Sequence, residues 1–255
     1  MRNARGLFTV QVRSELRECL NLWLDTVALK TESKHTVCVY GQVVSRFLEY
    51  LEVRGIDTLD AVEPCHVRAY LLERKQSGIS PSTLAKDYRH LHAFWNWCLR
   101  EELTTNNPFA KVEKPKPPAK VKPALTPDEV EAILRACEGK HWLRLRDRAL
   151  CLLLLDTGLR IHEVHNLTVG DAKQEVLLIR GKGGKQRVVF LSAEVRLAIR
   201  RYLNTCPYTL TDESPLWWGK CGALTQQGLQ SVVRDIGERA GLKKRLGPHA
   251  FRRTF

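Results

Sequence analysis

A short stretch rich in proline and lysine limits what this chain can fold into. Residues 111–124 read KVEKPKPPAKVKPA, with four prolines and five lysines in fourteen positions. Proline fixes φ and lacks a backbone donor, and lysine is costly to bury, so this stretch cannot pack into a core. We expect a linker at 111–124 between two domains, 14–110 and 125–255, after a short arm at 1–13.

Four segments before the linker carry apolar residues at helical spacing, which predicts an all-α four-helix domain. They are 14–30, 34–53, 64–76 and 81–102. Ser80 and Pro81 form a strong helix start, because serine caps the first turn and proline suits its first position. Trp95 and Trp97 lie in the fourth segment. Since aromatic residues at helical spacing are usually core, we interpret both as packed rather than as platforms for stacking bases.

The sequence after the linker predicts a mainly helical domain that also carries a β-hairpin. An apolar run, 149–155, ends near Gly158, a residue suited to a helix stop, and a short helix is expected at 160–167. Strand-like runs at 175–180 and 186–191 flank the glycine-rich 181–185. Further helices are expected after the capping residues Thr126, Ser192 and Thr225. The whole chain is thus expected to be mostly α with a small β-sheet, and its second domain α+β.

Composition narrows the possible partners. The net charge of +13 and pI near 9.5 favour a polyanion, without separating DNA from RNA or a membrane surface. No apolar run approaches the roughly 20 residues of a membrane helix, so we expect no membrane association. Eight cysteines occur without a C-x-x-C pair. They are interpreted as buried apolar residues in a reducing, cytoplasmic compartment.

Three motifs in the second half occur in a fixed order. They are TGLRIHE at 157–163, GKGGKQR at 181–187 and HAFR at 249–252. Together they resemble the tyrosine recombinases, or phage-type integrases, and the resemblance extends from about Ser14 to the last residue. It implies a core-binding domain before the linker and a catalytic domain after it. With no room before Ser14 for a further DNA-binding domain, the two-domain Xer-like form is expected.

The resemblance implies site-specific DNA recombination or integration. Strands are cut and rejoined through a 3′-phosphotyrosine, with double-stranded DNA as one partner and other protomers of a tetrameric synapse as the others. Arg160 and Arg252 would clamp the phosphate, because a guanidinium fork binds two oxygens and stays charged. His249 would donate to the same phosphate, and Lys182 would protonate the leaving 5′ oxygen. No metal and no cofactor are implied.

Other residues receive weaker assignments. Glu163, one turn from Arg160, would orient the site, although a helix-surface carboxylate is an open alternative. Basic residues expected to contact DNA are Lys86, Arg89, Lys114, Lys116, Lys120, Lys185 and Arg187. The linker is interpreted as a basic strap on DNA, with a plain solvated spacer as the alternative.

The nucleophile is the main departure from the family pattern. The family tyrosine follows the H-x-x-R motif by some tens of residues, whereas all six tyrosines here precede His249. Arg253 also stands where the family usually has a histidine. We therefore expect the catalytic domain to be truncated after Phe255 and this chain to be inactive in cleavage by itself. The alternative is a non-cleaving DNA-binding protein derived from an integrase.

Three other interpretations explain less. His162 and His165 are three apart, whereas a zinc-protease helix places its histidines four apart, so no metal site is expected. Residues 181–185 lack the Gly-Lys-Ser/Thr ending of a nucleotide phosphate loop. A recognition helix at 226–240 would indicate a repressor, but it would leave the three motifs unexplained.

The charge of the chain predicts DNA binding that depends strongly on salt. If six or more phosphates are neutralised, affinity should fall by orders of magnitude between roughly 50 and 200 mM salt, because counterions are released on binding. Replacing the five linker lysines by glutamine should weaken binding to all sequences alike. Gel-shift titrations measure both effects, and a flat salt response would contradict the prediction.

Overall fold

The computed structural model describes residues 15–118, 123–180 and 186–255, and the chain divides into two compact units. The first unit is Met1–Lys120 and the second is Val121–Phe255. Their boundary falls inside the sequence 111–124. The arm expected at 1–13 lies outside the described residues. No helix in the described ranges is long and apolar enough to cross a membrane.

The described residues of the first unit form four helices around an aromatic core. They are α1 (Glu15–Lys30), α2 (Lys34–Glu52), α3 (Pro64–Gln76) and α4 (Pro81–Arg100). The Ser80 side chain accepts a hydrogen bond from the Thr83 amide and caps α4. Trp95 and Trp97 are buried, and Trp95 makes an edge contact with the Phe47 ring of α2. The prediction of core packing for these tryptophans is confirmed, because neither ring is available to stack on a base.

The start of the predicted linker belongs to this first unit. Val112 is buried, and its carbonyl accepts a 2.8 Å hydrogen bond from the Tyr88 hydroxyl of α4. Arg68 of α3 also donates to the carbonyl of Lys111. The expectation that the extended segment begins at residue 111 was therefore wrong, because one apolar side chain and two carbonyls continue the packing. Lys120 lies outside the described residues.

The second unit is built around one helix whose second half is apolar on most of its surface. This helix, α6 (Trp142–Thr157), buries every residue from Ala149 to Leu154. It is packed by α9 (Ala193–Thr205), α5 (Pro127–Ala136), α10 (Gln226–Arg239) and α11 (Pro248–Thr254). A helix that is hydrophobic all round must be covered on all sides. These four helices therefore form a shell around α6.

The remaining elements of this unit are short. They are α7 (Ile161–His165), α8 (Val169–Lys173), β1 (Val176–Arg180), β2 (Gln186–Phe190), β3 (Trp218–Gly219) and β4 (Gly222–Ala223). The strands form two antiparallel pairs, β1 with β2 and β3 with β4. The expected fold class is confirmed, although α8 and the second pair were not predicted. The helix expected at 160–167 instead begins at Ile161 and ends at His165.

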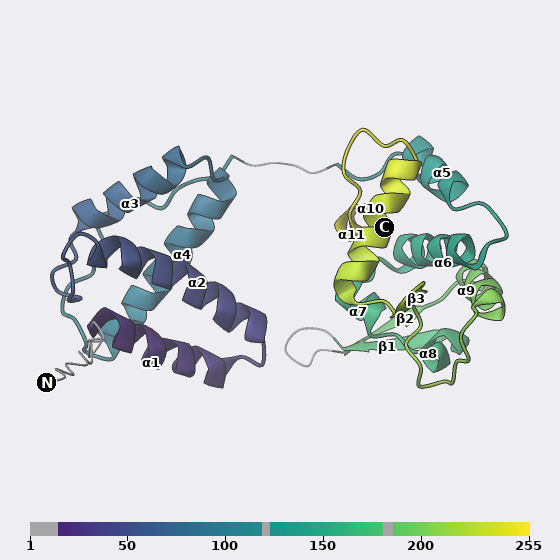
Figure 1. Cartoon of the computed structure of the whole chain (residues 1–255), viewed down its shortest axis with the longest axis horizontal. Coiled ribbons are helices and arrows are strands. Elements are labelled where there is room, and N and C mark those ends of the chain that lie inside the picture. Colours follow the sequence, from purple (N-terminus) through teal and green to yellow (C-terminus); the bar gives the residue numbers. More distant parts are fainter. Residues whose placement is uncertain (1–14, 119–122, 181–185) are drawn as a thin grey trace, which may run out of the picture. The chain divides into compact units, whose positions relative to one another are not determined.

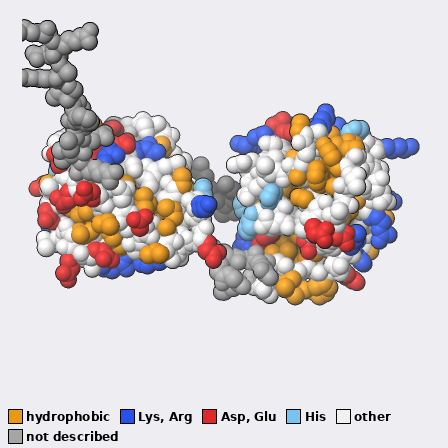
Figure 2. Space-filling model, turned by 60° about the horizontal axis from the view of Figure 1, so that its bottom comes forward, with side chains coloured by type: hydrophobic (Ala, Val, Ile, Leu, Met, Phe, Trp, Pro, Cys, Tyr) orange, Lys and Arg blue, Asp and Glu red, His pale blue; other side chains and the backbone are white. Residues whose placement is uncertain are grey.

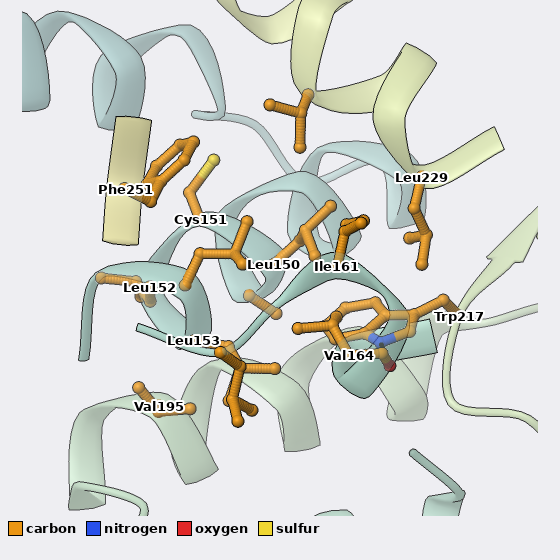
Figure 3. Close-up of a cluster of buried hydrophobic side chains, with 14 of the residues drawn as sticks. Leu150, Cys151, Leu152, Leu153, Ile161, Val164, Val195, Trp217, Leu229 and Phe251 are labelled. Atoms are coloured by element: carbon orange, nitrogen blue, oxygen red, sulfur yellow. Dashed lines mark hydrogen bonds between the residues drawn. The ribbon is translucent and has the colours of Figure 1, made fainter. Parts of the chain in front are cut away.

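Apolar anchors fix the short elements to α6. Figure 3 shows Ile161 of α7 beside Leu150, and Val164 of the same helix next to the Trp217 ring. The Trp217 indole also donates a 3.0 Å hydrogen bond to the Val164 carbonyl. Phe251 of α11 is fully buried and lies next to Cys151 in the same view. The elements that carry the first and third sequence motifs are therefore rooted in one core.

The cysteines do not all have the expected environment. Cys19, Cys98, Cys137 and Cys151 are buried, but Cys38, Cys65 and Cys221 are exposed. The expectation of uniformly buried cysteines was wrong. Composition alone does not show whether a residue lies on the buried or the exposed side of its helix or loop, and these cysteines do not follow the spacing of the apolar residues.

A close helix contact gives a stability prediction for the second unit. A Cβ on Gly237 of α10 would lie 2.4 Å from the Leu246 Cβ, so Gly237→Ala should destabilise by about 1–3 kcal/mol through overpacking. The control is Gly228→Ala in the same helix, where the nearest atom is 3.2 Å away on the flexible Leu224 side chain. It should be neutral or stabilising. Urea unfolding measures both, and equal stability of the two variants would contradict the packing argument.

Candidate active site

The site begins at the sharp turn that ends α6. Gly158 is the C-cap, with φ +54° and ψ 26°, and its amide donates to the Leu154 carbonyl. Only glycine adopts this left-handed conformation without steric cost. The Thr157 hydroxyl donates to the Leu153 carbonyl at 2.6 Å and accepts from the Leu159 amide at 3.3 Å. The turn is thus held from both sides, and it fixes where the next residue, Arg160, can point.

Arg160 is the N-cap of α7, and Glu163 completes its first turn. The Arg160 amide donates a 2.7 Å hydrogen bond to Glu163 Oε2, and its guanidinium Nη1 lies 3.2 Å from Oε1. The Arg160 side chain remains 44% exposed, whereas the Glu163 side chain is 1% exposed. The buried carboxylate therefore binds the Arg160 side chain on its inner side and leaves part of the guanidinium facing solvent.

Glu163 is ionised although it is buried. Burial raises the pKa of this carboxyl, but hydrogen bonds from Arg187 and from the Arg160 amide outweigh that effect and lower the pKa to about 2. Arg187 of β2 places Nη1 and Nη2 at 2.8 and 2.7 Å from the two carboxylate oxygens. Glu163 is thus a buried anion shared by two arginines. The alternative of a helix-surface carboxylate is wrong for this residue.

Arg252, which lies in the last helix of the unit, α11, contacts the same turn. Its Nη1 donates a 2.5 Å hydrogen bond to the Gly158 carbonyl, two residues before Arg160. The Phe255 ring packs on Gly158 so closely that an added Cβ would lie 2.8 Å from its Cδ1. The Thr254 hydroxyl accepts from the Leu125 amide at 2.9 Å. These contacts anchor α11 and bring Arg160 and Arg252, 92 positions apart, to one corner.

The other predicted residues fall into three groups. His249 is exposed in the first turn of α11, on the same helix face as Arg252. Lys182 and Lys185 lie outside the described residues. Four more lie exposed in the first unit: Lys86, Arg89, Lys114 and Lys116. On the face of each unit seen in Figure 2, basic side chains are dispersed among uncharged and acidic ones.

Sequence reasoning missed two partners at this corner. The Gly158 carbonyl as acceptor for Arg252 could not be read from the sequence, because it depends on how α11 packs. Arg187 was assigned to DNA, yet both of its terminal nitrogens bind Glu163. The sequence did contain a signal for the direction of the Arg187 side chain. Arg187 and the apolar Leu191 are an even number of positions apart in one extended run, so both side chains face the buried side of the hairpin.

The tyrosines of the second unit are engaged in its structure. Tyr202 is fully buried, and its hydroxyl accepts a 3.0 Å hydrogen bond from the Trp218 amide. Burial raises its pKa well above the ordinary value. The Tyr208 hydroxyl lies 2.9 Å from the carbonyl oxygens of Gly219 and Lys220. The other four tyrosines belong to the first unit.

Comparison with known proteins fits both units. Residues 123–255 match the model of the phage integrase family, and residues 20–102 match that of the phage integrase N-terminal SAM-like domain. This chain belongs to the phage integrase family. The tyrosine recombinase XerC of Anoxybacillus flavithermus is 31% identical to this chain over 245 residues, which cover 92% of the chain and 82% of that relative.

Solved structures agree with the fold of this chain. A lambda integrase dimer bound to a COC′ core site aligns with a TM-score of 0.73 at 18% identity, covering 94% of this chain and 68% of that one. A lambda integrase tetramer bound to a Holliday junction gives a TM-score of 0.72 at 18% identity, covering 99% and 73%. At these identities the likeness shows a shared fold.

The pKa of Glu163 gives a pH-dependent stability prediction. Its folded pKa of about 2 lies below the ordinary 4.5, so its contribution is present above pH 4.5 and is lost as pH falls towards 2. At about 1.4 kcal/mol per pKa unit, Glu163→Gln should cost about 3 kcal/mol at pH 7, and the gap to wild type should shrink below pH 4.5. Urea unfolding at several pH values measures this. Glu175→Gln, in an exposed pair with Arg196, is the control and should show little pH-dependent gap; a constant gap for Glu163→Gln would contradict the assignment.

Proposed function

We propose that this chain binds double-stranded DNA and takes part in site-specific breaking and rejoining of the DNA strands. The observation that carries the proposal is the corner at Gly158, where Arg160 and Arg252 are both partly exposed and both fixed by contacts from the same unit. Two fixed guanidinium groups can bind the non-bridging oxygens of one phosphodiester. They would stabilise the added negative charge of its pentacoordinate transition state.

The remaining roles follow from position and residue chemistry. His249, one turn before Arg252, would donate to the same phosphate or move protons, since imidazole titrates near neutral pH. Lys182 would protonate the leaving 5′ oxygen. The exposed Lys86, Arg89, Lys114 and Lys116 would contact phosphates without reading sequence. The relatives named as tyrosine recombinases, and the DNA-bound lambda integrase dimer and tetramer, support DNA and further protomers as partners, with the cytoplasm as the place of action.

We further propose that none of the six tyrosines is the nucleophile. An attacking hydroxyl must approach in line, at about 3–3.5 Å from phosphorus. The Tyr202 hydroxyl is buried away from solvent and the Tyr208 hydroxyl is bound to two carbonyls. These 255 residues would then bind and activate a phosphodiester but form no phosphotyrosine. The same observation favours a second candidate function, a DNA-binding protein that uses the integrase clamp without cutting.

Binding and trapping experiments test this proposal together. Arg160→Ala and Arg252→Ala should each weaken duplex binding about tenfold in fluorescence anisotropy, as expected for loss of a charged hydrogen bond. The matched control is Arg135→Ala, which removes an exposed arginine paired with Glu131 on α5, and it should have little effect. Equal effects of all three would contradict the phosphate clamp.

A nicked suicide duplex, from which the released strand diffuses away, tests the nucleophile. The 255-residue chain should yield no covalent adduct on denaturing gels. An adduct mapped to Tyr202 or Tyr208 would overturn the tyrosine argument and identify this chain as a divergent cleaving enzyme.

A further inference from the structure

The contact between Arg187 and Glu163 is more specific than a surface ion pair. Both terminal nitrogens of Arg187 bind both oxygens of the carboxylate, at 2.8 and 2.7 Å. This two-point geometry gives direction as well as charge, because the planar fork matches the planar carboxylate. The partners come from β2 and α7, which the sequence separates by 24 positions. The pair therefore ties the strand that follows residues 181–185 to the helix that begins beside Arg160.

Arg187 supplies two of the four hydrogen bonds that compensate the buried charge of Glu163, and the Arg160 amide supplies a third, of 2.7 Å. The Glu163 side chain is 1% exposed, whereas Arg160 and Arg187 are 44% and 35% exposed. Arg160 reaches the carboxylate by one guanidinium contact of 3.2 Å, which is weaker than the two contacts from Arg187. Asp171 of α8 lines the same hollow as Glu163 and adds negative charge there. Without Arg187, the carboxylate would depend on Arg160 alone.

We propose that Arg187 is a positioning residue for Arg160 and not a ligand of DNA phosphate. By holding Glu163 as a fixed anion, it determines where the exposed part of the Arg160 guanidinium lies. The inference rests on the proposed function only in that Arg160 is taken to bind a phosphate. If Arg187 turned to a phosphate instead, it would leave behind a buried and underpaired carboxylate, which is costly.

A double-mutant cycle separates positioning from direct binding. Arg187→Gln should weaken duplex binding by much of the factor seen for Arg160→Ala. The double variant should bind no more weakly than Arg160→Ala alone, because Arg187 acts through Arg160. Additive losses, with the salt slope lowered by about one for Arg187→Gln, would show a separate phosphate contact and overturn the proposal.

Two more variants sharpen this test. Arg187→Lys keeps the charge but lacks the fork, so it should remain defective; full rescue by lysine would indicate a phosphate ligand instead, since lysine serves there as a point charge. The matched control is Arg196→Gln, whose side chain is 34% exposed and pairs with Glu175 at 3.7 Å. It should show no coupling to Arg160, and coupling as strong as that of Arg187 would contradict the proposed path.

A measurement without DNA distinguishes failure of this inference from failure of the proposed function. If Arg160→Ala leaves DNA binding unchanged, the proposed function fails. The NMR signal of the Glu163 carboxyl carbon still tests whether Arg187 holds Glu163 as an anion. The wild-type signal should not titrate down to pH 3, whereas in Arg187→Gln it should titrate above pH 3, and in Arg196→Gln it should match wild type. An unchanged signal in Arg187→Gln would overturn the inference. If Arg187→Gln does not fold, the same measurement on Arg187→Lys decides.

Discussion

The buried carboxylate of Glu163 is the charge on which the geometry of this site depends. An ion moved out of water costs several kcal/mol unless close partners replace its hydration. Here four donors do so: the amide and guanidinium of Arg160 and the two terminal nitrogens of Arg187. Because removal of a partner from such a buried pair typically costs about 3–5 kcal/mol, the first turn of α7, the strand β2 and Arg160 are constrained to move together.

Shape supplies the second constraint. The second half of α6, from Ala149 to Leu154, is buried on every side, and α11 provides part of its cover through Phe251. Once α11 is packed, Arg252 lies within hydrogen-bond distance of the Gly158 carbonyl, and Phe255 closes over the glycine. A side chain at position 158 would clash with that ring and strain a backbone at φ +54°. Hydrophobic packing thus places the second arginine, whereas ion pairing places the first.

Local signals in the sequence predicted most of the fold, and tertiary contacts account for the rest. The caps at Ser80, Thr126, Ser192 and Thr225 were read correctly, because each depends on neighbours within one turn. The helix α8 was missed although Thr168 and Asp171 form a capping box, since the glycine between them reads as a breaker. The bidentate partner of Glu163 could not be predicted, because it depends on how β2 packs against α7. Strand parity gave the direction of Arg187 but not its target.

The number of charges and their geometry act separately in such a molecule. The net +13 arises from 41 basic and 28 acidic residues, and the faces seen in Figure 2 show them interspersed. Charges so dispersed and exposed are screened within about 10 Å at 0.1 M salt, so their contribution to binding a polyanion is largely independent of sequence. The corner at Gly158 differs because buried or backbone acceptors orient its arginines before any ligand arrives. Substitutions of dispersed lysines would therefore alter how tightly a polyanion is held, whereas substitutions behind Arg160 would alter how one phosphate is aligned.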